Sequence, residues 1–415
     1  MHGTSRSKII PMGAVSGYAR DGLNMYGGTV VLDSRSDVVP GSLYNEEIGY
    51  ADQLLRPDLA TAAIVPWADA TARLICDPYW HDGQPVAAAP RHVFSRVLAT
   101  CHDLGYEPLI GIEYEFYLLD GDTRAPLFGG QHIFNTVRNT WTPVIEQIID
   151  YLGAFGIDVI TANCEYAGSQ WEINFAPGRG LLGPDQAFSF KNAVKEIARR
   201  AGYVATFMSK PFAGGAGSGA HTHMTLLDLP RHTNAFAGSD PVSGLSEVGK
   251  SFLAGQLAHA QSVDALIAPT LNCLKRRRRH TFSPTNVSWG VEDRSAMVRV
   301  KSGPAENRHL ENRAPSAMSN PYLAAAALLA AGILGIRDNA PLPGPGQAPA
   351  EEDPSHPRLP ASLEESLRAL EADSEMTSLL GEEFVRCYVA VRRYELARFA
   401  DHVTDWEREE YLELY

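Results

Sequence analysis

The amino-acid sequence predicts an α+β fold. Residues 111–119 alternate between apolar and polar side chains, which is the pattern of a strand with one face on a core. Other segments, such as residues 90–105, repeat apolar side chains at the spacing of an amphipathic helix. Strands and helices do not alternate regularly enough for a doubly wound parallel sheet, so the α+β class is favoured.

The first part of the chain predicts a small β-rich region. Residues 1–89 are rich in Gly, Asp and Val, with short strand-like runs at 28–32, 62–66 and 72–77. Pro90 then starts a helix. A chain of 415 residues is long enough for a large core and a second, smaller domain. We therefore expect an N-terminal domain over residues 1–89 and a larger catalytic domain over 90–415.

The larger domain is expected to mix both kinds of element. Predicted helices cover residues 90–105, 140–155, 184–200 and 246–268, and predicted strands cover 111–119, 170–176, 214–227, 287–289, 296–301 and 308–313. Asn320 and Pro321 form an N-cap and first turn, and they start an Ala-rich helix expected to be buried. Residues 337–360 hold seven prolines, so they predict an irregular loop, and residues 363–415 predict packed helices.

Composition narrows the class of protein. The net charge of -13 argues against a general nucleic-acid or anionic-membrane binder. The five cysteines form no CxxC pair, so reduced thiols in a cytoplasmic protein are expected. The N-terminus predicts no signal peptide, and the most apolar run, residues 321–336, is shorter than the roughly 20 residues that span a bilayer.

The strand at residues 111–119 carries two carboxylates on one side. Glu113 and Glu115 are two residues apart, so their side chains share a face at a distance of about 7 Å. Like charges at that spacing raise each other's pKa unless a positive group lies between them. Taken alone, the pattern fits a solvated strand face equally well.

Three later segments repeat this arrangement. Glu172 lies on a predicted strand that follows Glu165 and a turn, His221 and His223 share one face of another, and Glu311 lies on a fourth. Each pattern alone has a structural explanation, but together they could converge. Oxygen ligands with an occasional imidazole favour Mg²⁺ or Mn²⁺ over Zn²⁺. Several such ions with arginines are what phosphoryl transfer from ATP requires.

Arginines for such a site follow further along the chain. They are the basic cluster at residues 275–279 and Arg294, Arg299 and Arg313. Guanidinium groups bind carboxylate or phosphate in bidentate fashion, which we favour over a nucleic-acid or targeting role in an acidic protein. Gly217 and Gly219 form a GxG without the following helix of a dinucleotide fingerprint, and no GxxxxGK[ST] loop is present in the sequence.

These ordered motifs resemble the glutamine synthetase family over nearly the whole chain. Residues 2–8 look like the family's HGxxRGK, 113–115 its ExE, 165–172 its E…GQxE, 210–223 its KP…NGSGMHxH, 269–276 its PTxNSYKR, 293–299 its NRSASIR, and 311–323 its ExR…NPYL. The resemblance implies a β-grasp N-terminal domain, shortened here, and a larger domain whose curved antiparallel sheet is lined by metal-binding Glu and His. It also implies a homo-oligomer of stacked hexameric rings, a dodecamer, with sites shared between neighbours.

The resemblance further implies roles for individual residues. Glu115, Glu165 and Glu172 would hold one metal ion, and Glu113, His221 and Glu311 another, with two or three Mg²⁺ or Mn²⁺ per site. His223, Thr225, Arg294 and Arg299 would bind ATP, and Gly217, His221, Arg276 and Arg313 the acid substrate and transferred phosphate. Arg294 and Glu165 are the expected catalytic residues. In the implied reaction ATP converts glutamate to γ-glutamyl phosphate, and an amine displaces the phosphate.

Two departures from the family pattern concern the substrates. Ala216 stands where the family has an Asn that helps hold glutamate, so binding of the acid is expected to differ. A gap-free count from Arg276 to Arg294 places Phe282 at the family's ammonium-site Glu, and Ser283-Pro284 fits the adjacent Ala-Pro. Phe282 removes cation affinity and a general base, and it supplies an aromatic wall instead.

We therefore expect an organic amine in place of ammonium. Arylamines are largely neutral near pH 7, so the best match is an arylamine such as aniline, as in the γ-glutamylanilide synthase type of amine catabolism. Ligases for alkylamines of the isopropylamine type, for polyamines, or for ammonium are the alternatives. A regulatory, non-enzymatic relative is a further alternative, against which the retained metal-ligand positions stand.

Overall fold

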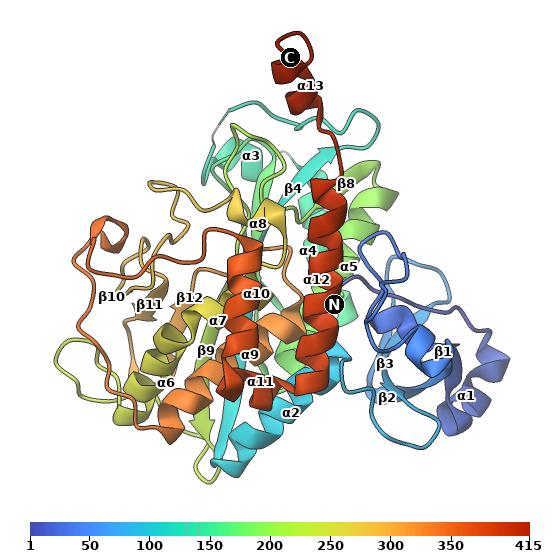
Figure 1. Ribbon diagram of the computed structural model, residues 1–415, viewed down its shortest axis with the longest axis horizontal. Helices are drawn as coiled ribbons and strands as arrows, with labels where there is room; N and C mark the ends of the chain where they lie inside the picture. Colours follow the sequence, from blue (N-terminus) through green and yellow to red (C-terminus); the bar gives the residue numbers. More distant parts are fainter. Residues whose placement is uncertain (131, 141) are drawn as a thin grey trace.

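The computed structural model describes residues 1–130, 132–140 and 142–415. It has the predicted α+β fold, with one large, mostly antiparallel sheet, one small sheet and helices packed around them (Figure 1). Within the described residues, no helix is long and apolar enough to cross a membrane.

The N-terminal part forms a separate lobe, drawn in blue at the lower right of Figure 1. After α1 (Val15–Asp21), strands β1 (Leu23–Tyr26), β2 (Asp52–Ile64) and β3 (Ala72–Tyr79) make an antiparallel sheet. The strand predicted at 28–32 is wrong, because Gly27–Val30 forms a 3-10 turn instead. The division into domains at residues 89 and 90 stays a prediction, although α2 does begin at Pro90.

A buried arginine joins this lobe to the rest of the molecule. The Arg91 guanidinium lies 2.7 Å from Asp58 on β2, 2.6 Å from Asp77 on β3 and 2.8 Å from Asp185 on α5. The Tyr322 hydroxyl donates to Asp185 over 2.6 Å. One cation therefore ties both long strands of the small sheet to two helices of the body, which fixes the orientation of the lobe.

The large sheet has the order β10-β11-β12-β9-β4-β6-β5, and β7 and β8 also pair with β4. Its strands are β4 (Tyr106–Asp120), β5 (Val159–Cys164), β6 (Gln170–Phe175), β7 (Gly178–Arg179), β8 (Tyr203–Thr206), β9 (Ala220–Asp228), β10 (Trp289–Val291), β11 (Val298–Lys301) and β12 (His309–Asn312). The pair β10–β11 is parallel. Strand β4 is the long central element, and it contains the acidic segment from which the sequence argument starts.

The helices of the body are close to those predicted. They are α2 (Pro90–Asp103), α3 (Thr136–Thr140), α4 (Pro143–Phe155), α5 (Leu182–Arg200), α6 (Glu247–Ala258), α7 (Ala260–Ile267), α8 (Leu271–Leu274), α9 (Pro321–Arg337), α10 (Leu363–Ala372), α11 (Ser374–Leu380), α12 (Glu382–Ala400) and α13 (Asp405–Tyr411). The helix predicted for 246–268 is divided at His259. The helix predicted from residue 140 starts at Pro143, and Trp141 lies outside the described residues.

Helix α9 is the centre of the core. Its residues from Pro321 to Gly335 are all buried, and the predicted cap is confirmed, because Asn320 Oδ1 accepts from the Tyr322 amide over 3.1 Å. Helices α6 and α9 cross very closely through Gly255 and Gly335. A methyl group built on Gly335 would lie 2.1 Å from the Ser251 carbonyl oxygen.

The close helix crossing predicts that Gly→Ala has opposite effects on the free energy of unfolding at two helical positions. Gly335→Ala should lower the free energy of unfolding by about 1–3 kcal/mol, because the helices must move apart. Gly153→Ala in α4, where an added methyl group meets nothing within 4 Å, should raise it by about 0.5–1 kcal/mol. Thermal and urea unfolding of both variants check this, and equal effects at the two sites would contradict the packing argument.

Candidate active site

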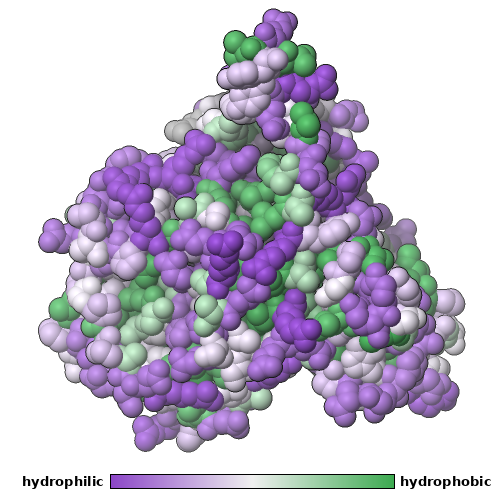
Figure 2. Space-filling model, viewed as in Figure 1, coloured by the Kyte–Doolittle hydropathy of each residue, from purple (hydrophilic) through white to green (hydrophobic). Residues whose placement is uncertain are grey.

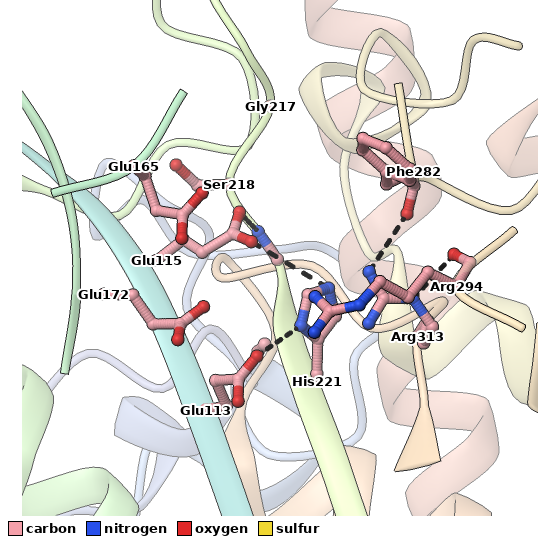
Figure 3. A network of polar contacts seen from close by, with 12 residues as sticks. Glu113, Glu115, Glu165, Glu172, Gly217, Ser218, His221, Phe282, Arg294 and Arg313 are labelled. Atoms are coloured by element: carbon pink, nitrogen blue, oxygen red, sulfur yellow. Dashed lines mark hydrogen bonds and ion pairs between the residues drawn. The ribbon is translucent and has the colours of Figure 1, made fainter. Parts of the chain in front are cut away.

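Strand register brings the predicted metal ligands together. Glu115 on β4 lies opposite Glu172 on β6, and Glu113 on β4 lies opposite His221 on β9. The next pair continues across the sheet, because His223 on β9 lies opposite Glu311 on β12. Since each strand contributes alternate residues, these side chains project from one face of the sheet. Figure 3 shows Glu113, Glu115 and Glu172 beside His221.

The first group of candidate ligands is Glu113, His221 and Glu311, whose ligand atoms lie within 4.8 Å of one another. His221 Nδ1 is 2.8 Å from a Glu113 carboxylate oxygen, and His223 Nε2 is 3.7 Å from the other. Burial raises the pKa of Glu113, but the two histidines outweigh burial and hold that pKa well below its usual range. Glu113 is therefore ionised and ready to hold a cation.

Glu311 also pairs with two arginines. Its carboxylate lies 3.0 Å from Arg299 Nη1 and accepts a hydrogen bond from Arg313 Nη1. Burial alone would raise its pKa, but Arg313 and the histidines lower it to about 2. A metal ion at Glu311 would therefore compete with these arginines for the same two oxygens.

The second group is Glu115, Glu172 and His221, again with ligand atoms within 4.8 Å of one another. Burial and the charges of Glu113 and Glu115 raise the pKa of Glu172 to about 10. Burial and Glu115 raise the pKa of Glu165, at the end of β5, to about 7. The protein's own positively charged side chains thus do not neutralise the carboxylates in this half of the site.

This donor set fits divalent metal ions. Carboxylate oxygens dominate it, with one imidazole shared by both groups, as Mg²⁺ and Mn²⁺ prefer. The raised pKa values of Glu165 and Glu172 indicate that ionising these carboxylates costs free energy in the ion-free site. Bound cations would remove that cost. The residues present therefore fit two adjacent ions.

Arg276 lies buried behind the glycine run that precedes β9. Its Nη2 donates to the Arg313 carbonyl over 3.2 Å and lies 3.3 Å from His221 Nε2. A Cβ at Gly217 would lie 2.4 Å from Arg276 Cγ, and one at Gly219 would lie 2.6 Å from Arg276 Nη2. The glycines are thus required because the arginine side chain occupies the space of a side chain at either position.

The other basic residues divide between the site and the surrounding structure. Arg313 Nε donates to the Arg294 carbonyl over 3.0 Å, while the Arg294 side chain is exposed. Of the predicted cluster at 275–279, Arg277 pairs with the buried Asp264 and serves the core. Arg276 is the member of this cluster that contacts the site, through His221 Nε2.

The predicted nucleotide-binding residues lie further along the same strand. His223 Nδ1 is 3.1 Å from His309 Nε2. Thr225 is buried, and its hydroxyl donates to Asn234 Oδ1 over 2.7 Å. The i, i+2, i+4 spacing of His309, Glu311 and Arg313 predicts that they share one strand face, whereas Asn234 was missed in the sequence.

Phe282 is at the other wall of the site. Its carbonyl accepts from Arg313 Nη2 over 3.4 Å, and its ring centroid is 5.7 Å from that of Tyr166. In Figure 3 Phe282 lies on the arginine side, and Glu165 lies on the opposite, carboxylate side. Tyr166 directly follows Glu165, and the sequence analysis did not single it out.

The raised pKa values predict that metal ions stabilise the protein more as pH rises. The ion-free fold keeps protons on Glu165 and Glu172 that the unfolded chain releases, so its stability falls as pH rises above about 4.5. Divalent ions replace those protons. Millimolar Mg²⁺ or Mn²⁺ should therefore raise the melting temperature by several degrees at pH 8 and by less at pH 6.

Glu172→Gln should remove most of this pH dependence, because it deletes the carboxylate with the higher pKa. Glu146→Gln on the surface of α4 serves as the matched control and should behave like the unmodified protein. A melting temperature unaffected by either ion at both pH values would show that the carboxylate groups do not bind metal.

Known proteins with this arrangement share both sequence and fold with the chain. The family described as glutamine synthetase, catalytic domain, matches residues 87–411. The glutamate–isopropylamine ligase of a Pseudomonas species is 33% identical over 380 residues, covering 88% of this chain and 82% of that protein. The glutamine synthetase of Mycobacterium bovis is 35% identical over 392 residues, covering 88% and 86%.

A solved structure described as "GmaS/ADP complex-Conformation 1" matches with a TM-score of 0.87 at 29% identity, covering 99% of this chain and 94% of that one. The catalytic-domain match spans most of the chain, and it includes every strand that carries the carboxylates and histidines of the site. The chain therefore belongs to the glutamine synthetase family and is an amide-forming ligase of that type.

Proposed function

We propose that this protein is an ATP-dependent ligase that activates the γ-carboxyl of glutamate as γ-glutamyl phosphate and joins it to an organic amine, best an arylamine. The observation that carries the proposal is Phe282, an aromatic residue whose backbone carbonyl accepts from Arg313, at the position where ammonium-using relatives are expected to have a carboxylate. Members of the family use ATP and divalent metal ions, and the site offers carboxylate and imidazole ligands for the ions.

We assign the metal ligands by the family motifs that they match; all of them lie on strands of the sheet except Glu165, which follows β5. Glu113, His221 and Glu311 would hold one ion, and Glu115, Glu165 and Glu172 another, either Mg²⁺ or Mn²⁺. Bound there, the ions supply positive charge that neutralises the phosphate oxygens of ATP. The strands contribute a fixed spacing between the two groups, so the nucleotide is presented in one orientation.

The arginines would bind the acid and the transferred phosphoryl group. Arg299 and Arg313 each bond Glu311, so they already lie at the edge of the metal groups. Arg294 is exposed toward solvent and is the expected contact for the phosphates, and Glu165 is the expected catalytic carboxylate. Together the arginines stabilise negative charge as it develops on the phosphoryl group.

The amino-acid end of glutamate is expected near Arg276 and Gly217. Ala216 removes an amide that the family uses there, and the Ala216 carbonyl is occupied by the Tyr117 hydroxyl, which donates to it over 2.7 Å. His223 and Thr225 are assigned to the nucleotide. The acid is thus held chiefly by buried guanidinium and backbone groups.

The amine is expected to be neutral and apolar. Phe282 supplies no charge to bind ammonium and no base to deprotonate it. An arylamine is largely neutral near pH 7, so it needs neither. A branched alkylamine is the second candidate, favoured by the similarity to glutamate–isopropylamine ligase.

We further propose a homo-oligomer, with the dodecamer of the family as the expected form. The end of the chain, from the end of α12 through α13, projects from the body in Figure 1, and apolar atoms gather at its tip in Figure 2. Its exposed apolar side chains include Phe399, Val403, Trp406, Leu412 and Leu414. Such a surface favours burial against another copy. The five cysteines are unpaired thiols, which agrees with the proposed cytoplasmic location.

The oligomer proposal predicts a change of size in one variant. Trp406→Asp with Leu414→Asp should lower the mass measured by light scattering after size exclusion, because charge is placed in the buried contact. Val242→Asp, an equally exposed apolar position on the body, is the control and should leave the mass unchanged. An unaltered mass in the double variant would contradict this role for the C-terminal segment.

The central test of the proposed reaction is ATP-dependent phosphate release with glutamate and a panel of amines. The panel contains ammonium, isopropylamine, putrescine and aniline. Aniline or isopropylamine should give a kcat/KM at least tenfold above that of ammonium. Equal use of ammonium would contradict the role of Phe282, and no turnover with any amine would contradict the ligase assignment.

Phe282→Glu should shift the preference toward ammonium. A carboxylate at this position restores cation affinity and a base, so kcat/KM for ammonium should rise at least tenfold while that for aniline falls. Phe282→Gln, which adds a polar group without charge, is the matched control and should not improve ammonium use. No change in preference would show that Phe282 lies outside the amine path.

A further inference from the structure

We propose that Tyr166 and Phe282 act as one aromatic wall of the amine subsite, so that Tyr166 is a specificity-determining residue; this inference rests on the proposed function. The two rings lie 5.7 Å apart at an interplanar angle of 31°. Both side chains are partly exposed, and Phe282 remains 45% exposed although it packs against Tyr166. The pair therefore presents apolar surface outward without being part of the core.

The position of the pair places it across the site. Tyr166 directly follows Glu165 in the turn between β5 and β6, on the carboxylate side. Phe282 is on the loop after α8, and its carbonyl accepts from Arg313 on the arginine side. The contact between the two rings therefore connects the turn that follows β5 with the loop that follows α8. In the proposed function the phosphorylated carboxyl group would lie between Glu165 and Arg313, so the rings would border the path of the attacking amine.

The backbone of the loop holds Phe282 in this place at a cost. Phe282 has a φ of 55°, in the left-handed region that a residue with a Cβ rarely adopts. The loop is anchored on both sides, because the His280 amide donates to Glu351 over 3.1 Å and the Leu359 amide donates to the Thr285 carbonyl over 3.1 Å. Strained residues that their surroundings maintain are concentrated at binding sites.

The charges that face the wall favour a neutral amine. On the loop side Arg313 donates to the Phe282 carbonyl and to the Arg294 carbonyl. On the strand side the carboxylate is Glu165, which the proposed function assigns to a metal ion. A protonated amine beside the rings would therefore meet Arg313 and find Glu165 already engaged. An aryl or branched alkyl group instead gains contact with two apolar ring faces.

The test measures kinetic constants for Tyr166→Ala, Phe282→Ala and the double variant with aniline, isopropylamine and hydroxylamine. Tyr166→Ala should raise the KM for aniline about tenfold and change the KM for glutamate and ATP less than twofold. Its kcat with hydroxylamine, which has no apolar group, should stay within about twofold. The double variant should lose less than the product of the single losses, because the rings act as a pair.

Two variants serve as controls. Tyr166→Phe keeps the ring and should retain the KM for aniline within about twofold. Tyr50→Ala removes another exposed tyrosine, with a φ of 56° and an aromatic neighbour, Tyr26, in the N-terminal lobe. It should leave all the kinetic constants unchanged and thus accounts for general effects of losing such a ring.

The outcomes separate this inference from the proposed function. If the unmodified protein uses no organic amine, the proposed function fails. If it does use one, and Tyr166→Ala leaves the KM for that amine unchanged, the aromatic wall is overturned while the function stands. Equal increases in KM for amine, glutamate and ATP in Tyr166→Ala would assign Tyr166 a structural role and also overturn the wall.

Discussion

The constraint on which the site depends is the burial of several carboxylates on one face of one sheet. Strand β4 places Glu113 and Glu115 on the same face, and its neighbours add Glu172, His221 and Glu311 in register. Burial disfavours the charged carboxylates, and in a medium of low dielectric they also repel one another; the pKa of Glu172 rises to about 10 as a result. Cations, from the protein or from solution, must complete the site.

The two halves of the site solve this problem differently. Around Glu311 the protein supplies its own cations, and the pKa of that carboxylate falls to about 2. Around Glu165 and Glu172 it does not, and their pKa values rise. In the proposed reaction, metal ions would bind the carboxylates, and Arg299 and Arg313 would then be free to contact the phosphoryl group. In the proposed function most of the metal ligands lie on the rigid sheet, while the residue proposed to select the amine lies on a loop.

Local sequence patterns predicted much of this arrangement. The long-range contacts could not be predicted from the sequence. Alternation along residues 111–119 was enough to place Glu113 and Glu115 on one face, and the Asn320 cap followed from residue type alone. Pairing partners could not be derived, because alternation does not say which strand lies beside β4. The pairing of Arg277 with Asp264 on α7 and the contact of Tyr166 with Phe282 depend on segments that meet only in the fold. Short apolar runs also gave a wrong strand prediction at residues 28–32. Gly27–Val30 instead forms a 3-10 turn, in which the two glycines pack closely against Tyr26 and Trp80.

The most direct measurement of the central claim is anomalous diffraction from crystals grown with Mn²⁺ and an ATP analogue. Two adjacent peaks per chain are expected, one among Glu113, His221 and Glu311 and one among Glu115, Glu165 and Glu172. Arg299 and Arg313 are also expected to turn from Glu311 toward the phosphates. Peaks elsewhere, or no peak while both arginines stay on Glu311, would contradict the assignment of these carboxylates as the metal site.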